Sequence, residues 1–95
     1  MPYIADGQRN MFKTWLSMFR DIITFRYNMN YKHIEDGEMN YVITSLIQDW
    51  LGDDPHYTDY NSAIGVLECV KLELYRRKIA KYEDMKKKEN GDVYL

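Results

Sequence analysis

The sequence is poor in the features that most often reveal a function. It holds one cysteine, Cys69, which excludes an internal disulfide and agrees with a reducing compartment. Its longest apolar runs are three or four residues, so we expect a soluble protein that does not enter the membrane. The first residues lack the basic start and the apolar stretch of a secretory signal, which predicts a cytoplasmic location.

Features of nucleic-acid and nucleotide-cofactor binding are also missing. The formal net charge is −2, whereas general nucleic-acid binding needs many lysines and arginines on one face. The sequence has neither a Gly-rich phosphate loop nor a dinucleotide fingerprint. We therefore expect no general nucleic-acid binding, although local basic clusters remain as candidates for a smaller anion.

Residues suited to catalysis or metal binding are few. His33 and His56 are the only histidines, and neither has cysteines or carboxylates at the usual spacing of a metal site. The acidic stretch "HIEDGE" lacks the pattern of a calcium loop, and acidic residues before a helix usually cap it. Cys69 is expected to be a small buried side chain rather than a nucleophile. We expect no enzyme, no metal and no cofactor, although carboxylates from two subunits could meet at an interface.

Aromatic residues are the unusual abundance. The chain has nine tyrosines, three phenylalanines and two tryptophans among 95 residues. Tyrosine combines an apolar ring with a polar hydroxyl, so it suits the core edge, ligand pockets and interfaces alike. A chain of this length predicts one domain, residues 1–95, and a single copy only marginally stable unless it oligomerises.

Hydrophobic spacing predicts an all-α fold, a three-helix bundle-like domain with a long C-terminal helix. The expected helices cover residues 6 to about 23, 38–51 and 59–87, each with an apolar stripe at helical spacing that should pack in the core. Asn90-Gly91 is a good stop for the last of them. Asp36 or Gly37, and Thr58 or Asp59, are the expected N-terminal caps of the second and third helices.

Residues 25–33 alternate between larger and polar side chains within "FRYNMNYKHI". This period of two favours a short strand near residues 25–33, which would need a partner strand from "DVYL" or from a second subunit. A loop rich in tyrosine and asparagine is an equally good interpretation.

The expected third helix carries two stripes at about 100° per residue. The first is expected to pack on the other two helices, and its members are Ala63, Leu67, Val70 and Leu74, continued by Arg77 and Lys81. The second predicts a contact with another subunit, and its members are Gly65, Cys69, Leu72, Arg76, Ile79 and Glu83. We expect a homo-oligomer through this helix, with Arg76 either in a salt bridge to Glu83 or a symmetry mate, or in contact with an anion, and with Glu73 pairing with Arg77.

Two stretches resemble a family of short, functionally uncharacterised proteins of tailed bacteriophages and some bacteria. They are "GEMNYVITSLI" and "IGVLECVKLELYRRKIAKYEDMKKKENGDVYL", which together cover roughly the last two thirds of the chain. The resemblance implies a viral or prophage context and no established activity. The segment "TFRYNMNYKHI" looks like an insertion, and Lys81 stands where relatives are expected to have a proline.

A phage context favours a protein that acts by binding in the host cytoplasm. The leading hypothesis is an oligomer that sequesters a small anionic, nucleotide-derived host defence signal, with tyrosines stacking on a base and cations neutralising phosphate. Its candidate residues are Asn40, Tyr41, Lys71, Tyr75, Arg76, Arg77 and Tyr82. The rival hypothesis is a protein–protein interaction module that inhibits or recruits a host or virion protein through the same side chains.

Overall fold

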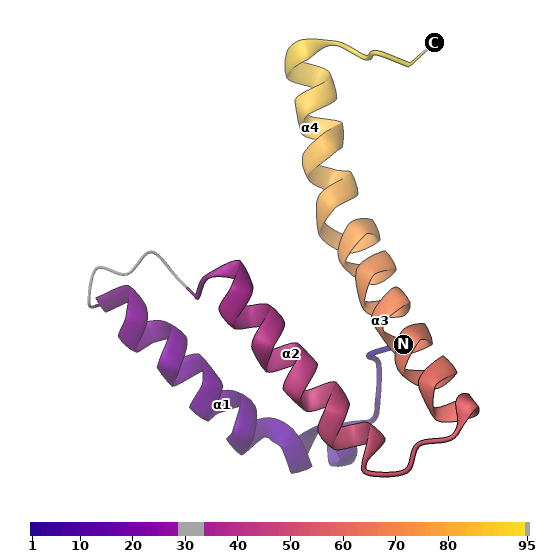
Figure 1. Cartoon of the computed structure of the whole chain (residues 1–95). Helices are drawn as coiled ribbons and strands as arrows, with labels where there is room; N and C mark the ends of the chain where they lie inside the picture. The colour runs from indigo at the N-terminus through magenta and orange to yellow at the C-terminus, as the bar shows by residue number, and fades with distance from the viewer. Residues whose placement is uncertain (29–33, 95) are drawn as a thin grey trace. The chain divides into compact units, whose positions relative to one another are not determined.

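The computed structural model describes residues 1–28 and 34–94, and all regular structure in these ranges is helical. The all-α class and the long C-terminal helix predicted from the sequence are confirmed. The chain divides into two compact units, which are Tyr3–Pro55, and Met1–Pro2 together with His56–Leu95 (Figure 1). We call them the hairpin unit and the long-helix unit.

The hairpin unit begins with α1, which runs from Asp6 to Asn28. It is about five residues longer than predicted, because residues 24–28 continue the helix, including Phe25 to Asn28, for which a strand was predicted. The strand prediction is wrong for these four residues, and its remainder, residues 29–33, lies outside the described residues. In the helix, Arg26 lies one turn beyond Ile22 on the same face. Its guanidinium reaches Glu38 from this position. In a strand, successive side chains alternate between two faces, so Arg26 would not keep this position relative to α1.

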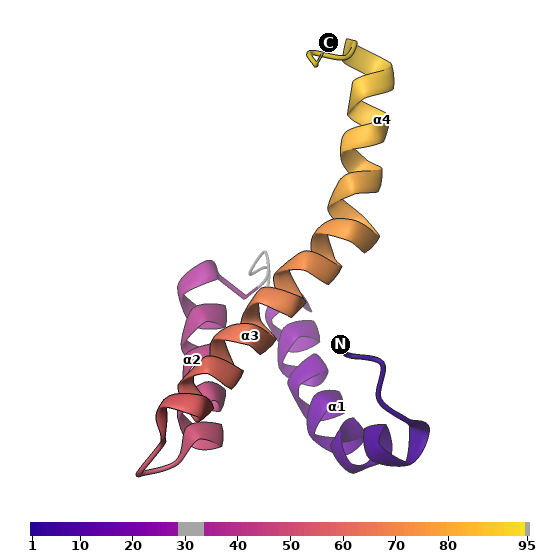
Figure 2. The same ribbon diagram turned by 90° about the vertical axis from the view of Figure 1, so that its right-hand side faces the viewer.

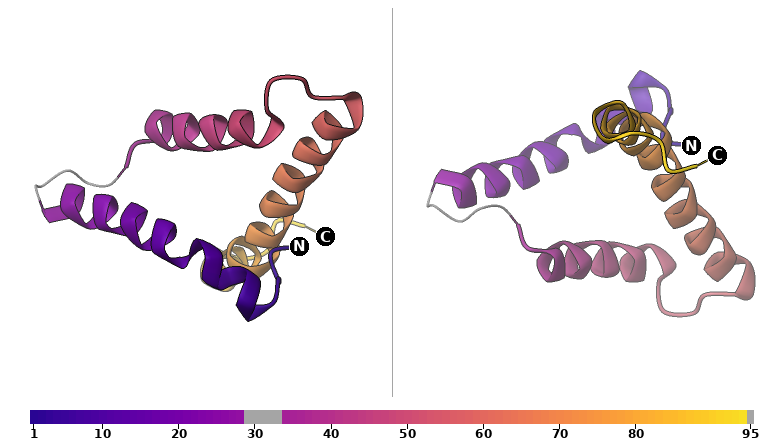
Figure 3. Two further views of the ribbon diagram at one scale, coloured as in Figure 1. Left: turned by 90° about the horizontal axis from the view of Figure 1, so that it is seen from below. Right: turned by 90° about the horizontal axis from the view of Figure 1, so that it is seen from above.

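The second helix of this unit, α2, covers Asp36–Leu51 and runs antiparallel to α1 (Figures 1 and 3). It begins two residues earlier than predicted because Glu35 serves as its N-cap. The Glu35 backbone N–H donates to Oε1 of Glu38 at 3.0 Å, as in a capping box. The helix ends at Gly52, whose φ of 75° and ψ of −166° belong to a region that is essentially restricted to glycine.

The long-helix unit contains α3 (Tyr57–Leu74), the π-turn η1 (Tyr75–Ile79) and α4 (Ala80–Asn90), which follow one another without a break. Figure 2 shows that the helix changes direction between α3 and α4. His56 is the N-cap, and its backbone N–H donates to Oδ2 of Asp59 at 2.8 Å. The predicted stop at Asn90-Gly91 is confirmed, since Gly91 adopts a φ of 90°.

The expected apolar stripes are present on the helices, but most of their side chains are exposed. Among the described residues only Ala63 is buried, with 4% of its surface accessible. In the hairpin unit, Trp15 stacks on Phe19 with ring centroids 6.2 Å apart, yet Trp15 is still 45% exposed. Each unit therefore presents apolar helix faces, and the packing of the first stripe of α3 on the other helices stays a prediction.

Candidate functional site

The candidate residues predicted from the sequence belong to both units. Asn40 and Tyr41 lie in the first turns of α2, within the hairpin unit. The other five lie on the long helix, and they are Lys71, Tyr75, Arg76, Arg77 and Tyr82. The two groups therefore lie on surfaces of different units.

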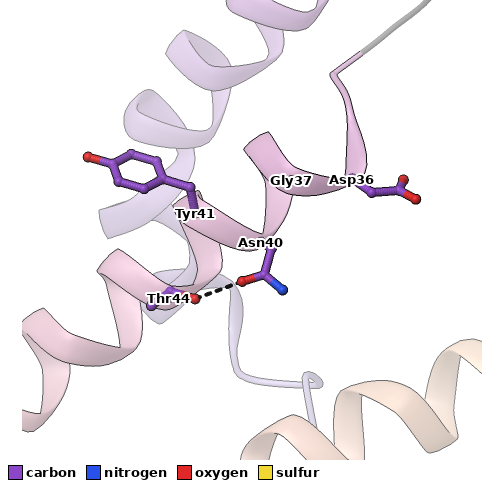
Figure 4. A pocket seen from close by; sticks show the side chains of 5 residues that line it. All are labelled: Asp36, Gly37, Asn40, Tyr41 and Thr44. Carbon is purple, nitrogen blue, oxygen red and sulfur yellow. Dashed lines mark hydrogen bonds between the residues drawn. The ribbon is translucent and has the colours of Figure 1, made fainter.

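Asn40 and Tyr41 line a shallow hollow on α2, together with Asp36, Gly37 and Thr44 (Figure 4). The Thr44 hydroxyl donates to Oδ1 of Asn40 at 3.0 Å, which fixes the amide against the helix. Figure 4 shows the Tyr41 ring projecting from a different side of the helix than Asn40. This lining offers hydrogen-bonding groups and one carboxylate but no cation, so it is poorly matched to a phosphate.

A second hollow of the hairpin unit lies between α1 and α2. Its lining is largely apolar, with Phe19, Ile22, Arg26, Ile34, Gly37, Glu38, Tyr41 and Val42. Arg26 forms a bidentate ion pair with Glu38, with Nη1–Oε2 at 2.8 Å and Nη2–Oε1 at 2.9 Å. These hydrogen bonds from Arg26, followed by the one from the Glu35 backbone, lower the pKa of the Glu38 carboxyl below its usual value.

Sequence reasoning did not select Arg26 or Glu38. Arg26 stands among alternating aromatic and polar residues, a pattern that predicted a strand. The position of Arg26 on a helix and its pairing with Glu38, twelve positions later, could therefore not be predicted. The signal that could have found the pair is the acidic residue at the third position of a capping box, which lies close to the end of the preceding helix.

The π-turn η1 interrupts the regular α-helical hydrogen bonding of the long helix. It contains three of the predicted site residues, Tyr75, Arg76 and Arg77. The backbone N–H of Ala80 donates to the carbonyl of Tyr75, five residues earlier, instead of four as in an α-helix. The Tyr75 hydroxyl donates to Oε2 of Glu83 at 3.1 Å, and this bond, with the nearby negative charge of Glu83, raises the pKa of Tyr75. Such π-turns are frequent at functional sites.

The ion pairs around this turn differ from those predicted. Nη2 of Arg76 lies 3.3 Å from both carboxylate oxygens of Glu73, so Arg76 pairs backwards along the helix. The predicted bridge from Arg76 to Glu83 and the predicted pair of Glu73 with Arg77 are therefore wrong, whereas contact of Arg76 with a symmetry mate or an anion stays a prediction. Glu83 instead accepts the bond from Tyr75, because the π-turn brings residue 83 onto the side of residue 75.

The π-turn also changes which side chains lie in line. In a regular α-helix positions seven apart lie nearly above one another. Because the π-turn takes up roughly one extra residue, later positions are rotated back by about 100°. Lys78 and Tyr82 therefore follow Leu74 along the helix, where Arg77 and Lys81 were predicted. By the same shift Ile79 and Glu83 leave the second predicted stripe, which continues through Ala80 and Asp84.

The five predicted residues on the long helix do not converge on one face. Lys71 and Tyr75 are neighbours one turn apart, whereas Arg76 and Arg77 point in successive directions around the helix. Nζ of Lys71 lies 3.2 Å from Oε1 of Glu68. Within residues 1–28 and 34–94, Arg77 has no ion-pair partner. It differs in this from Lys71 and Arg76, which each pair with a carboxylate.

Cys69 is exposed rather than buried as expected, and it lines a hollow of the long-helix unit with Met1, Pro2, Ser62, Gly65, Val66 and Val70. Within the described part of the chain, His, Cys, Asp and Glu form no group of three that could hold a metal ion. No helix in the same residues has both the length and the apolar character that crossing a membrane requires.

Fold and surfaces together define a small all-helical protein whose apolar helix faces are open. The chain belongs to the family described as "Domain of unknown function (DUF6899)", whose match covers residues 1–93. This match includes the first third of the chain, which the resemblance drawn from the sequence did not cover. No curated protein and no solved structure matches the chain.

Proposed function

We propose that the chain is a non-enzymatic helical protein that acts by binding other polypeptides through its apolar helix faces, first of all in a homo-oligomer built on the long helix. The observation that carries the proposal is the exposure of large apolar side chains in both units, with Ala63 alone buried among the described residues. Extended apolar patches on a protein surface mark interaction sites more often than isolated apolar residues do.

The hairpin unit offers side chains of the kind that anchor protein interfaces. On α1, Phe12 is 53% and Trp15 45% exposed, and on α2 Trp50 is 57% exposed. Aromatic residues and methionine are enriched in the cores of interfaces, and the aromatic rings cover a large area with few rotatable bonds. This composition supports contact with a polypeptide rather than with solvent alone.

The resemblance to proteins of tailed phages supports a partner in an infected cell. In that context a host enzyme or a virion protein is the expected partner, and the host cytoplasm is the expected location. The proposal therefore has two parts, which are self-assembly through the long helix and binding of a second polypeptide by the hairpin unit.

Native mass spectrometry of the protein recovered from infected cells tests the proposal. We expect a homo-oligomer, or a complex of defined stoichiometry with a host or virion polypeptide. Trp15→Ser in the hairpin unit should release the second polypeptide, whereas Lys13→Ser, two positions away on the polar side of α1, should retain it. A protein that stays monomeric and free of polypeptides at all concentrations would falsify the proposal.

Sequestration of a nucleotide-derived anion is the second candidate function. It is favoured by Arg77, whose charge has no ion-pair partner within the described residues, and by the exposed ring of Tyr82, over which Nζ of Lys86 lies 5.7 Å from the centroid. It ranks below polypeptide binding because Lys71 and Arg76 are paired with carboxylates. A phosphate would have to displace these carboxylates.

The same mass spectra test this second function. A nucleotide-sized mass retained by the oligomer supports it, and Arg77→Glu should then remove that mass. Lys13→Glu makes the same charge change in the hairpin unit and should leave the mass in place. Loss of the mass in both variants, or in neither, contradicts a site at the π-turn.

A further inference from the structure

The π-turn produces a longer apolar face than the sequence predicted. We call it the aligned stripe, and its members are Ala63, Leu67, Val70, Leu74, Lys78, Tyr82 and Met85. The spacings from Leu74 to Lys78 and from Lys78 to Tyr82 cover eight residues, one more than two α-helical turns normally take. The extra residue is the one that the π-turn accommodates, as the bond from Ala80 to the Tyr75 carbonyl indicates.

The side chains of this stripe are mostly apolar and mostly uncovered. Val70, Leu74, Tyr82 and Met85 are between 50% and 58% exposed, and Leu67 is 37% exposed. Without the π-turn, Lys81 would follow Leu74 and Tyr82 would be turned about 100° away. The irregular turn thus extends an apolar surface from α3 into α4, whose sequence is otherwise strongly charged.

We propose that the aligned stripe pairs, antiparallel, with the aligned stripe of a second copy, with Leu74 close to the twofold axis. This pairing replaces two predictions from the sequence, the packing of the first stripe on the other helices and the contact of the second stripe with another subunit. This inference rests on the proposed function, of which it specifies the self-assembly. A twofold pair is self-complementary, because residue i of one copy meets residue j of the other and the reverse.

Charge complementarity selects a second copy in the antiparallel direction. Tyr57–Leu74 contains three acidic residues and one basic residue, a net charge of −2, whereas Tyr75–Asn90 contains seven basic and three acidic residues, a net charge of +4. An antiparallel pair places each positive half beside the negative half of the other copy. A parallel pair would place the two positive halves together, which like charges oppose.

Side-chain size fits the same pairing. With Leu74 at the centre, the smaller Leu67 lies close to the larger Tyr82, whereas Ala63 is already buried within the chain and takes no part in the contact. Alternation of small and large side chains across a helix pair fills the space between the backbones. Lys78 falls opposite Val70, where its aliphatic stem can cover the valine while its ammonium reaches the acidic half of the other copy.

A pair of matched substitutions tests the face. Leu74 and Leu72 are both leucines of α3, with exposures of 54% and 56%, but only Leu74 belongs to the aligned stripe. Leu74→Glu should weaken self-association about tenfold or more, because it places two unpaired charges at the centre of the interface. Leu72→Glu should leave the association nearly unchanged. Sedimentation equilibrium measures both, and circular dichroism checks that helix content is retained.

Disulfide trapping tests the direction and does not depend on a destabilised variant. In a Cys69→Ser background, Leu67→Cys and Tyr82→Cys are prepared separately and then mixed under oxidising conditions. Antiparallel pairing should give the mixed disulfide between positions 67 and 82, since a bridge requires Cα atoms within about 7 Å. Bridges between two copies of position 67, or between two copies of position 82, would show a parallel pair and overturn the inference.

The outcomes separate this inference from the proposed function. If the wild-type chain associates but Leu74→Glu does not weaken it and no mixed disulfide forms, the pairing is wrong and polypeptide binding through another face stands. If the wild-type chain forms neither an oligomer nor a complex with a second polypeptide, both proposals fail.

Discussion

The hairpin unit and the long-helix unit differ in the range of their polar contacts. In the hairpin unit, the Arg26–Glu38 pair joins two helices across twelve residues of sequence. In the described part of the long-helix unit, the ion pairs join residues three positions apart on the same helix, as in Lys71–Glu68 and Arg76–Glu73. Such local pairs stabilise a helix but fix no neighbour against it. We therefore propose that the long helix binds a partner through the aligned stripe.

Changing the number of residues in the π-turn is expected to have the largest effect of all, and the affected quantity is self-association through the aligned stripe of the long-helix unit. Deletion of Lys78 should convert η1 into an ordinary α-turn and keep Tyr82 and Met85 in line with Leu74, so self-association should persist. Insertion of one alanine after Lys78 should rotate them by about 100° and weaken association about tenfold or more. Sedimentation equilibrium compares the two variants. If the deletion breaks the pair and the insertion preserves it, the assignment of the aligned stripe is wrong.

Substitution of Gly52, the glycine that ends α2, is expected to have the next largest effect, on the stability of the hairpin unit. Gly52→Ala should lower the free energy of unfolding by on the order of 1–3 kcal/mol, because alanine is strained at this backbone conformation. Both tryptophans, Trp15 and Trp50, lie in the hairpin unit, so denaturation followed by tryptophan fluorescence reports on that unit.

Gly37→Ala is the matched control for Gly52→Ala, because Gly37 lies inside α2 and an added Cβ meets no atom within 4 Å. Alanine there should raise stability by roughly 0.5–1 kcal/mol. Equal destabilisation by the two substitutions would contradict a special role for the conformation of Gly52.

Acid should weaken the hairpin unit through protonation of Glu38. The pKa of Glu38 is lower in the folded protein than its ordinary value of 4.5, so folding favours the charged carboxylate. The resulting stabilisation is complete above pH 4.5 and is lost as pH falls through the lowered pKa. Glu38→Gln should remove this pH dependence from the tryptophan-monitored transition, whereas Glu89→Gln at the end of α4 should not. An unchanged profile in Glu38→Gln contradicts the assignment.

Alkali should act on the long-helix unit, with the smallest effect. The pKa of Tyr75 is raised above its ordinary value of 10.0, so folding favours the neutral phenol. Its stabilising contribution is present below pH 10.0 and is lost as pH rises through the raised pKa. Tyrosinate absorbance should show a late-titrating group that Tyr75→Phe removes and Tyr57→Phe retains. If the late-titrating group is still present in Tyr75→Phe, the bond from Tyr75 to Glu83 is excluded.

Most of the fold was predictable because helix periodicity and helix ends are local signals. The spacing of apolar residues predicted all three helices, and Asn90-Gly91 marked the end of the last. The helical phase of Arg26 was missed because it is stabilised by Glu38, which is distant in sequence. The π-turn was missed because an i to i+5 bond has no distinctive residue pattern, and the uniform phase assumed for the long helix then misplaced Tyr82 and the partner of Arg76.

The π-turn has a consequence for how relatives of this chain are aligned. A helix can absorb an inserted residue in such a turn without losing the face that follows it. A family member with one residue fewer between Glu73 and Ala80 can therefore present the same apolar side chains as this one. An alignment that treats residues 57–90 as one uninterrupted α-helix, with no gap allowed, would compare non-equivalent positions from Ala80 to Asn90.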